Sequence, residues 1–443
     1  MSADFTARAL AVQETARARR LRILRLLAAS IERVGGRYPA DDAAPPTIGA
    51  DTASITMPSP KVWSALSTPL TGSYWSLRSD RFTLYGGVYR GGNQYVSPDA
   101  NTLFYTSVTQ GDGSNPAANI APLPGGKMRF MTDAPKFELS VYLGQNAQPQ
   151  QLEMRVDGLR VPTQFGRAAS SANDFAFRYI PVTFGDGSET HRRLRRIEIL
   201  CIGYGAAHPG AVITDQRSFV GPWAQPDALK VGVVGDSFTE GVYGFGVGGG
   251  LGDLIGQADT WNSGLGATGW FADAGGARSS MDERWPYDVT ARGFDVVFDL
   301  NGINDGGQTA SAAAYRDKML PHYTATLAAK PETIVVLTGP MSTGSAGNVN
   351  AGQLLVRAGK KLLAAAFPKN AIFLDNLGDA AMPLAQEPWV TGNGRVGATA
   401  NDGNADLVTG ADGTHPSPYG NLYLAQRIAA ETARAIPALI AAQ

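Results

Sequence analysis

The hydrophobic and polar positions follow three successive patterns along the chain, of which the first is helical. Ala, Leu, Arg and Glu dominate residues 1–36, and Gly35-Gly36 ends this stretch. Apolar residues recur within it in steps of three and four, at Leu21, Leu24, Leu27 and Ile31. Such steps place side chains on one face of a helix, so the pattern predicts an amphipathic helical arm at residues 1–36.

Prolines interrupt any regular element in residues 37–72. They stand among many Ala, Asp, Ser and Thr residues, at Pro39, Pro45, Pro46, Pro58, Pro60 and Pro69. Because proline breaks a helix interior and donates no hydrogen bond to a sheet, this composition predicts an extended linker.

Residues 73–222 follow the second pattern, in which short β-rich runs alternate with Gly, Asn, Asp and Pro turns. Polar and apolar residues alternate over Lys136–Leu143, as they do in a half-buried strand. Asp157-Gly158 separates two β-rich runs and is a good hairpin turn. Several short strands joined by turns predict an antiparallel β-sandwich. We expect strands at Arg81–Tyr85, Lys127–Met131, Phe137–Leu143, Gln151–Val156, Phe175–Thr183 and Arg195–Ile202.

Residues 229–443 follow the third pattern, in which apolar runs alternate with helical stretches. The runs are short and nearly continuous, at Val231–Val234, Phe294–Leu300, Thr333–Leu337 and Ala371–Leu374. Such runs are typical of parallel strands that are buried on both faces. The helical stretches are at Ala310–Ala329, Ala351–Ala366 and Asn421–Ala435. Strands alternating with helices predict a doubly wound α/β domain.

Composition and charge exclude several classes of function. The 38 Lys and Arg residues nearly balance the 39 Asp and Glu residues, so the chain lacks the basic field of a nucleic-acid-binding protein. Cys201 is the only cysteine, which excludes an intrachain disulfide and a cysteine-based zinc site. The sequence also lacks the run of about 18 apolar residues that a membrane span requires.

The arginines of the arm raise the question of a signal peptide. Arg19-Arg20 resembles a twin-arginine signal, but Arg22 and Arg25 interrupt the stretch that would have to be uncharged. We therefore expect no cleaved signal peptide. A basic amphipathic helix can lie on an anionic membrane, but we favour an apolar stripe that packs on a neighbouring element, with docking onto a partner chain as the alternative.

A candidate nucleophile, Ser237, stands where the first parallel strand is expected to end. The sequence Val233-Val234-Gly235-Asp236-Ser237 runs from a buried strand into a polar turn. Ligands bind at the carboxyl ends of the strands in open α/β sheets, so this serine is placed to react. If a helix begins there, its N–H groups also favour a developing anion. The alternative is that Ser237 only caps a helix.

A candidate base lies near the C-terminus, in Asp412-Gly413-Thr414-His415. An acid three residues before a histidine can hold one ring nitrogen within a single turn and leave the other nitrogen for a serine. A lone histidine is more often structural, but this chain has only four histidines to compete for the role. Ser237, His415 and Asp412 together therefore predict a catalytic triad.

Two further segments offer hydrogen-bond donors for an oxyanion. Asn304 follows the strand Phe294–Leu300 and is expected at the same sheet edge as Ser237, unless it only forms an Asn-Asp turn. Gly264 and Gly266 follow Asn262, and glycine lets a backbone N–H approach a ligand closely.

These segments, taken in order, resemble the SGNH branch of the GDSL hydrolases. The four matching blocks are Gly235-Asp236-Ser237, the glycine block that includes Gly266, Gly302-x-Asn304-Asp305 and Asp412-x-x-His415. The resemblance covers about residues 229–443. It implies a flavodoxin-like α/β/α fold for this region.

The resemblance also implies a role for each residue. Ser237 is the implied nucleophile, His415 the general base and then acid, and Asp412 its orienting partner. The implied oxyanion hole consists of the N–H groups of Ser237 and Gly266 and the side chain of Asn304. The family spaces its second block as Asn-x-Gly-x-x-Gly, and the shorter spacing here leaves Gly264 as an alternative to Gly266.

Other catalytic and cofactor motifs are absent or incomplete. Neither the Gly-x-Ser-x-Gly elbow of ordinary α/β-hydrolases nor a Walker or His-Glu-x-x-His motif occurs. Residues 244–249 match Gly-x-Gly-x-x-Gly, the pattern of nucleotide-binding loops, but they do not directly follow a strand as such loops do. We therefore expect a flexible glycine loop there. The sequence therefore predicts no metal and no cofactor.

The expected sandwich supplies a second, looser resemblance. The phrases Phe130–Pro135, Arg155–Gly158 and Arg195–Ile199 resemble the jelly-roll that precedes the SGNH domain in carbohydrate esterase family two. That family removes acetyl groups from polysaccharides. The resemblance implies a serine esterase that deacetylates a polysaccharide or cell-surface glycan through an acetyl-enzyme intermediate. The sandwich then either contacts sugar or only braces the catalytic domain.

Two other functions stay open. SGNH domains accept many acyl groups, so a lipid or thioester hydrolase is one alternative. Arm, linker and esterase also resemble the layout of bacteriophage spike or fibre proteins, in which the arm docks on the particle or forms a homo-oligomer and the outer domains bind glycan. That hypothesis predicts a protein that is virion-associated, or cytoplasmic before release. It also predicts that residues 1–72 can be deleted without loss of solubility or activity.

Overall fold

The computed structural model describes residues 3–32, 47–48, 52–54, 72–76, 83–85, 87–91, 102–106, 127–143, 150–161, 165–167, 176–201, 207–223, 228–241, 246–255, 258–341, 350–378 and 388–443. Two compact units make up the chain. The α/β unit consists of Met1–Val34, Thr109–Ile120 and Ala228–Gln443, and the sandwich unit of Gly35–Val108 and Ala121–Asp227. No helix among the described residues is long and apolar enough to cross a membrane.

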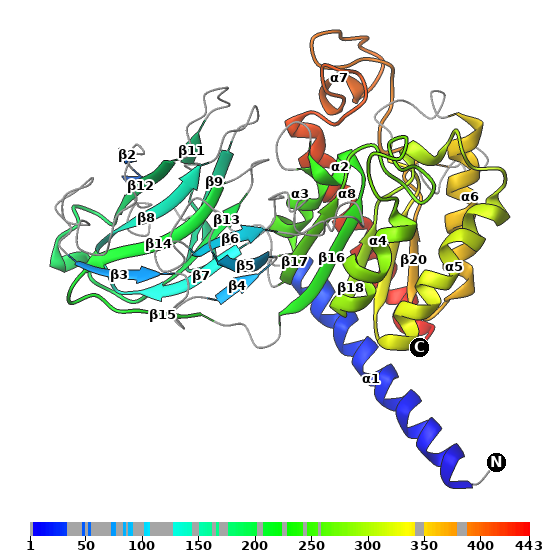
Figure 1. The fold of residues 1–443 in the computed structure, drawn as a ribbon, viewed down its shortest axis with the longest axis horizontal. Helices are drawn as coiled ribbons and strands as arrows, with labels where there is room; N and C mark the ends of the chain where they lie inside the picture. The colour runs from blue at the N-terminus through cyan, green and yellow to red at the C-terminus, as the bar shows by residue number, and fades with distance from the viewer. Residues whose placement is uncertain are drawn as a thin grey trace. The chain divides into compact units, whose positions relative to one another are not determined.

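Two large antiparallel sheets form most of the sandwich unit (Figure 1). The first sheet has the order β1 (Thr47–Ile48), β12 (Ala176–Thr183), β8 (Lys136–Leu143), β14 (Ala207–Asp215), β3 (Gly72–Ser76), with β2 (Thr52–Ser54) also paired to β12. The second has the order β10 (Leu159–Arg160), β9 (Gln150–Val156), β13 (Arg195–Cys201), β7 (Lys127–Thr132), β15 (Val220–Pro222), with β11 (Phe165–Arg167) paired to β9 and β4 (Thr83–Tyr85) to β7. A separate pair consists of β5 (Gly87–Gly91) and β6 (Thr102–Thr106), and a 3₁₀ turn spans Glu189–His191.

Apolar side chains from both sheets meet in one core, which confirms the predicted sandwich. Phe130 of β7 and Phe137 of β8 come from opposite sheets, and their ring centroids lie 5.7 Å apart in an edge-to-face arrangement. The predicted hairpin also forms between β9 and β10. Its turn residues Asp157 and Gly158 both have positive φ, as a two-residue hairpin turn requires.

Part of the predicted linker belongs to the sandwich. Strands β1 and β2 lie within residues 37–72 and pair with β12, with Thr47 opposite Thr183 and Thr52 opposite Tyr179. The linker prediction is therefore wrong for these two strands, because their backbone groups complete a sheet edge. The remaining residues of 37–71 lie outside the described residues.

Five parallel strands form the sheet of the α/β unit. Their order is β17 (Ala258–Gly264), β16 (Leu229–Gly235), β18 (Val296–Asp299), β19 (Ile334–Thr338), β20 (Ala371–Leu374). The first strand in the chain, β16, thus lies between the second and the third. This is the flavodoxin-like strand order, which confirms the predicted doubly wound fold.

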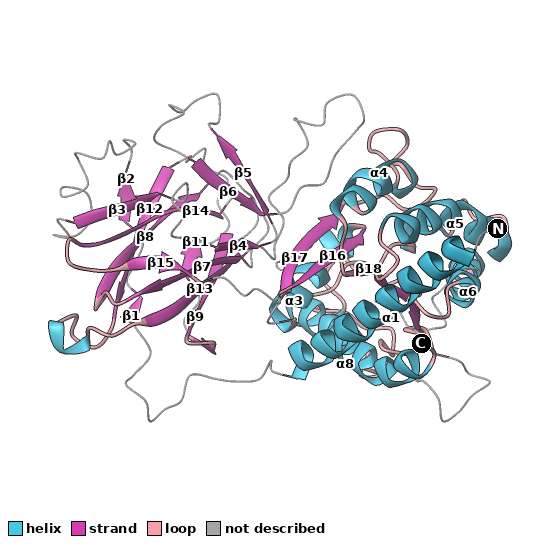
Figure 2. Ribbon diagram, turned by 90° about the horizontal axis from the view of Figure 1, so that it is seen from below, coloured by secondary structure: helices cyan, strands magenta, loops and turns pink. Residues whose placement is uncertain are grey.

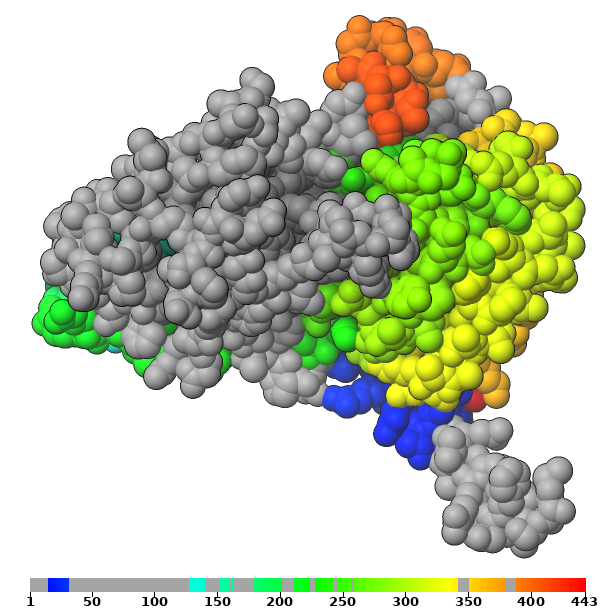
Figure 3. Space-filling model, in the orientation of Figure 1, coloured from blue at the N-terminus to red at the C-terminus, as the bar shows by residue number. Residues whose placement is uncertain are grey.

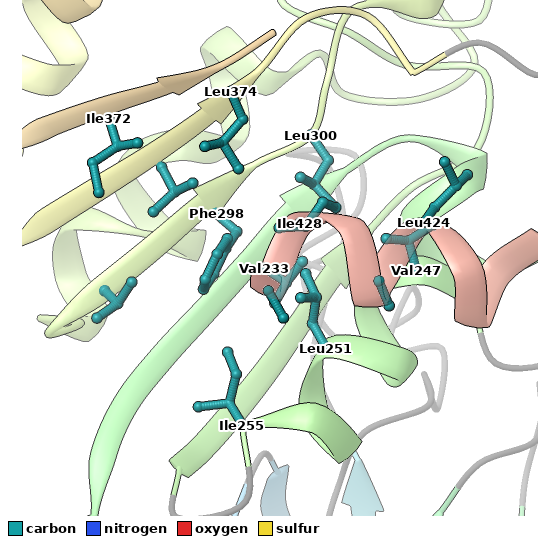
Figure 4. Close-up of a cluster of buried hydrophobic side chains, with 14 of the residues drawn as sticks. Val233, Val247, Leu251, Ile255, Phe298, Leu300, Ile372, Leu374, Leu424 and Ile428 are labelled. Atoms are coloured by element: carbon teal, nitrogen blue, oxygen red, sulfur yellow. The ribbon is translucent and has the colours of Figure 1, made fainter. Parts of the chain in front are cut away.

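Helices cover both faces of this sheet (Figure 2). One face carries α1 (Ala3–Glu32), α3 (Gly246–Leu254) and α8 (Pro418–Ala441), and the other carries α4 (Met281–Asp288), α5 (Ala312–Ala329) and α6 (Ala351–Ala366). Neighbouring residues alternate between the two cores, so Val233 packs on the first face and Val234 on the second. Figure 4 shows the first core, in which Leu251 of α3 and Ile428 of α8 surround Val233.

The shorter elements of the α/β unit are α2 (Ser237–Glu240), α7 (Ala405–Val408) and the 3₁₀ turns Thr290–Arg292 and Ile303–Asp305. The segment around α7, orange in Figure 3, rises above the rest of the α/β unit.

The predicted N-terminal helix exists, but its apolar stripe is part of the α/β core. Leu24 and Leu27 are fully buried against the same cluster as the strands, and α1 lies alongside α8 (Figure 2). Arg20 Nε donates to Gln443 Oε1 at 2.6 Å, and its Nη1 donates to Pro331 O at 3.0 Å. These contacts tie the helix to the C-terminus and to the loop before β19.

This packing corrects the prediction of an arm that can be removed with residues 1–72. The sequence shows an apolar stripe but not what covers it, and the covering surface is the chain's own sheet and α8. Deletion would expose apolar side chains of β16 and β19 to water, which costs roughly 25 cal/mol per Å². Docking onto a particle or a second copy stays a prediction.

Leu24→Ala should lower the free energy of unfolding of the α/β unit by about 2–5 kcal/mol, because it removes a fully buried side chain from a packed core. Leu354→Ala is the matched control, since Leu354 is 46% exposed on α6 and its loss should cost less than about 0.5 kcal/mol. Urea denaturation followed by tryptophan fluorescence compares the two. Equal stabilities of both variants would show that α1 is not part of the core.

Candidate active site

Strand β16 ends in a tight turn that presents Ser237. A Cβ on Gly235 would lie 1.8 Å from Thr239 Oγ1, so only glycine fits the end of this strand. Asp236 is the N-cap of α2, and its Oδ1 accepts a hydrogen bond from the N–H of Phe238 at 3.0 Å. Ser237 follows as the first residue of the helix. Because Asp236 is the cap, the alternative role of Ser237 as a mere capping residue is excluded.

The structure brings the other two predicted triad residues to this serine. His415 Nε2 lies 3.0 Å from Ser237 Oγ, although the two residues are 178 positions apart. On the other side of the ring, His415 Nδ1 lies 2.6 Å from Asp412 Oδ2. The three side chains thus form one continuous chain of hydrogen bonds from hydroxyl to carboxylate.

The charge of Asp412 decides which nitrogen of His415 carries the proton. Burial alone would raise the pKa of Asp412, but hydrogen bonds from the His415 ring and from the N–H groups of Thr414 and His415 lower it to about 2. The carboxylate is therefore ionised at neutral pH and accepts from Nδ1–H. Nε2 of a neutral ring is then left to accept the Ser237 proton.

Asn304 lies at the same edge of the sheet, in the 3₁₀ turn after β18. Its Nδ2 donates to Thr268 O at 3.0 Å, which places the amide beside loop 265–268 at the end of β17. This loop starts next to the nucleophile turn, because Leu265 N–H donates to Gly235 O at 3.0 Å. The structure therefore brings together the blocks that carry Ser237, Asn304 and His415.

The two glycines predicted as backbone donors are not available in this structure. Gly266 N–H donates to Glu240 Oε2 at 2.6 Å, and Gly264 N–H donates to Asn262 Oδ1 at 2.9 Å. Both N–H groups are thus already engaged by side-chain oxygens. The assignment of Gly266 to the oxyanion hole needs correction for this reason.

Ala267 offers a backbone N–H in this loop that the sequence analysis did not consider. It has a φ of 60°, in the left-handed region that favours glycine, and it is exposed. Among the hydrogen bonds of the described residues, none has its N–H as donor. The signal was available, because Ala267 stands where Asn-x-Gly-x-x-Gly, counted from Asn262, places its last glycine.

Two buried carboxylates beneath the site were also missed. Asp305 accepts from the N–H groups of Trp270, Phe271 and Ala272 at 2.9–3.0 Å and from the Tyr315 hydroxyl. The approach is so close that a Cβ on Gly269 would lie 2.2 Å from Asp305 Oδ1. Asp305 therefore fixes the end of the 265–272 loop against the sheet.

Asp299, at the end of β18, is the second buried carboxylate. It accepts from Lys360 Nζ at 3.2 Å, from Trp270 Nε1 at 3.2 Å and from the Tyr323 hydroxyl at 2.5 Å. Both side chains of the Asp299–Lys360 pair are fully buried. If one partner of a buried ion pair is lost, the other charge stays buried without compensation and the fold is strongly destabilised. This pair therefore holds α6 against the edge of the sheet.

The glycine-rich segment has a packing role. Its described part belongs to α3, where a Cβ on Gly248 would lie 2.7 Å from Asn262 Nδ2 and a Cβ on Gly250 would lie 2.8 Å from Ala425 Cβ. The small residues let α3 approach β17 and α8, so the flexible-loop prediction is wrong for them; residues 242–245 lie outside the described residues. No group of three metal-ligating side chains occurs among the residues described.

Comparison with protein families agrees with this geometry. A family model described as GDSL-like lipase/acylhydrolase matches residues 233–422, which include Ser237, Asn304, Asp412 and His415. Residues 233–422 form a GDSL-like lipase/acylhydrolase domain. The match agrees with the GDSL resemblance of the four motif blocks. A search of curated proteins finds no match to the chain.

Solved structures resemble the chain at low sequence identity. A salicylyl-acyltransferase from a tetracycline biosynthetic pathway has a TM-score of 0.53 at 12% identity, over 83% of this chain and 96% of that one. A family two carbohydrate esterase from Cellvibrio japonicus has a TM-score of 0.47 at 11% identity, over 82% and 98%. An acetyl xylan esterase from the rumen bacterium Butyrivibrio proteoclasticus has a TM-score of 0.48 at 12% identity, over 81% and 98%. At these identities the likeness concerns the fold.

Asp236 makes the stability of the GDSL-like domain depend on pH. Burial, reinforced by the negative charges of Asp305 and Asp299, raises the pKa of this carboxyl to about 7, although the Phe238 N–H and Lys360 act in the opposite direction. The unfolded chain loses this proton near pH 3.8, whereas the folded chain keeps it up to about 7. The stabilising contribution is therefore complete below about pH 4 and is lost as the pH rises through 7.

Asp236→Asn should remove this dependence, because asparagine still caps the helix but does not titrate. Between pH 4 and 7, the wild type should lose stability relative to the variant by up to about 1.4 kcal/mol per pH unit. Urea denaturation across this range measures the difference, with Asp317→Asn on α5 as the control for removing an exposed carboxylate. Parallel stability curves for wild type and Asp236→Asn would contradict the raised pKa.

Proposed function

We propose that the chain is a serine esterase that removes O-acetyl groups from an acetylated polysaccharide. The observation that carries the proposal is the hydrogen-bond chain from Ser237 Oγ through His415 to Asp412. A serine hydroxyl is a weak nucleophile and needs an adjacent base, which His415 Nε2 supplies at 3.0 Å. The GDSL-like domain match supports ester hydrolysis as the reaction class.

In the proposed first step, Ser237 Oγ forms a bond to the acetyl carbonyl carbon and gives its proton to His415 Nε2. The imidazolium is stabilised by the ionised Asp412. The ester C–O bond then breaks, the sugar hydroxyl leaves with the proton from His415, and the acetyl group stays on Ser237.

In the proposed second step, water hydrolyses the acetyl-enzyme. His415 takes a proton from the water, whose oxygen attacks the acetyl-enzyme, and returns it to Ser237 Oγ as acetate leaves. The negative charge on the carbonyl oxygen in both steps is stabilised by the N–H groups of Ser237 and Ala267 and by the Asn304 amide. Each such preorganised donor is worth about 10²–10³ in kcat.

The surroundings of the serine support a short acyl group on a polar substrate. Glu240 and Arg278 flank the loop beside Ser237, and the Asn304 amide donates to Thr268 O of the same loop. The Asp412 and His415 side chains are 32% and 22% exposed, so a bulky polymer can reach them. A long acyl chain would instead need an apolar groove. A glycan is proposed as the partner because of this polar, exposed site and because the sandwich resembles a carbohydrate esterase jelly-roll in sequence.

Ser237→Ala should leave the fold intact and lower acetate release by about 10⁶ in kcat, since it removes the nucleophile. Ser311→Ala is the matched control, because Ser311 caps α5 through Ala314 N–H and its loss should cost about 1 kcal/mol of stability without a change in kcat. Acetate release is measured on acetylated xylan, acetylated mannan and acetylated pectin beside p-nitrophenyl octanoate. A purified Ser237→Ala protein with more than a few per cent activity contradicts the mechanism, and preference for the octanoate contradicts the substrate class.

Asn304→Ala should lower kcat by about 10²–10³ and leave KM nearly unchanged, because the amide is used only once the oxyanion forms. The variant also loses the hydrogen bond to Thr268 O, so its thermal unfolding is measured beside its kinetics. A raised KM with an unchanged kcat would show that Asn304 binds the ground state of the substrate instead.

A further inference from the structure

We propose that Glu240 and Arg278 form a clamp on Gly266 that aims the Ala267 N–H at the oxyanion. Both are positioning residues, since they act through the backbone and do not touch the reacting atoms. The inference rests on the proposed serine esterase mechanism and adds to it the device that holds one of its donors.

The clamp forms hydrogen bonds with both backbone polar groups of Gly266. Glu240 Oε2 accepts from Gly266 N–H at 2.6 Å, and Arg278 Nη1 donates to Gly266 O at 2.6 Å. The two side chains also face each other, with 3.9 Å between Arg278 Nη1 and Glu240 Oε2. An ion pair therefore closes around a single residue of the loop.

Because the peptide is planar, these hydrogen bonds also orient the N–H of Ala267. The carbonyl of Gly266 and the N–H of Ala267 belong to the same planar trans peptide and point in opposite directions. When Arg278 fixes the carbonyl, it also fixes the direction of the N–H. A guanidinium on the carbonyl polarises the peptide as well, which makes the N–H a stronger donor.

The conformation of Ala267 shows why the loop needs holding. A φ of 60° is strained for an alanine, and such strain persists only where the surroundings enforce it. Gly266 leaves room for the enforcing groups, because a Cβ there would lie 2.7 Å from Glu240 Oε2 and 3.1 Å from Arg278 Nη1. The same Cβ would lie 3.5 Å from Ser237 Cβ, so the clamp is adjacent to the nucleophile.

Charge gives Arg278 a second effect on the reaction. A carboxylate beside the oxyanion opposes the negative charge that develops there, and the nearby guanidinium of Arg278 offsets this repulsion. Both effects act on the transition state, so the loss of Arg278 should lower kcat much more than it changes KM.

The first test compares Arg278→Gln with Arg357→Gln. Arg357 is the matched control, because it also bonds a carboxylate, Asp375, and a backbone carbonyl, Gly378 O, but not at this loop. Arg278→Gln should lower kcat about 10- to 100-fold with KM within about twofold, as expected for a misaimed group. Arg278→Lys should fall between Arg278→Gln and wild type, and Arg357→Gln should keep the wild-type kcat.

A double variant separates charge from aim. Glu240→Gln keeps an oxygen for Gly266 N–H but removes the charge, so adding it to Arg278→Gln should recover part of the lost kcat. An Arg278→Gln enzyme with wild-type kcat, or a double variant that recovers wild-type kcat in full, overturns the clamp. The proposed function fails separately, by retention of activity in Ser237→Ala.

Backbone substitution tests the donor itself. Replacing Ala267 with lactic acid exchanges its N–H for an ester oxygen, which should lower kcat about 10²–10³-fold. Affinity for a phosphonate transition-state analogue should fall by a similar factor, a readout that mere loss of folded protein does not mimic. The matched control is Gly266→glycolic acid, which removes only the donor to Glu240 and should cost less. The reverse ranking of these two variants would make Gly266 the oxyanion donor and overturn the inference.

Discussion

The structure around the site depends on two buried carboxylates, Asp299 and Asp305, that have no access to water. Taking Asp299 and Asp305 out of water costs several kcal/mol each unless donors surround them. The donors come from segments far apart in the chain, since Lys360 lies on α6, Tyr323 on α5 and Trp270 in the loop after β17. Satisfying the two charges therefore fixes the loop after β17 and the turn after β18, which carry Ala267 and Asn304.

The parallel sheet supplies the second part of this organisation. All of its strands end at one edge, so the residues that follow β16, β17 and β18 meet there despite their separation in sequence. Asp412 and His415 precede α8, whose apolar face packs on the same sheet, and this packing brings His415 to Ser237. Burial of apolar surface on this sheet therefore brings His415 to Ser237.

The sequence predicts those features that depend on local chemistry. Apolar runs identify β16 and β18, the Asp157-Gly158 turn identifies a hairpin, and the spacing of Asp412 and His415 identifies their hydrogen bond. These are properties of a few neighbouring residues, and the folded chain preserves them.

Features that depend on distant partners could not be predicted in this way. The stripe around Leu24 requires an apolar partner but does not specify α8 and the sheet. The hydrogen bond from Gly266 N–H to Glu240 likewise depends on a tertiary contact, although the family spacing counted from Asn262 already points to Ala267. Asp299 looks like the end of an ordinary strand until Lys360 is seen to face it. Each of these outcomes is set by tertiary contacts rather than by local propensity.

The central claim is that Ser237, activated by His415 and Asp412, is the nucleophile of this chain. The most direct measurement is mass spectrometry of the protein after reaction with a fluorophosphonate, which bonds to activated serines and displaces fluoride. The account predicts one phosphonyl group per chain, on the peptide that contains Ser237, with loss of esterase activity in step with labelling. It also predicts no label on Ser237→Ala and much slower labelling of His415→Ala. A label on another residue, or full inhibition with Ser237 unmodified, would contradict it.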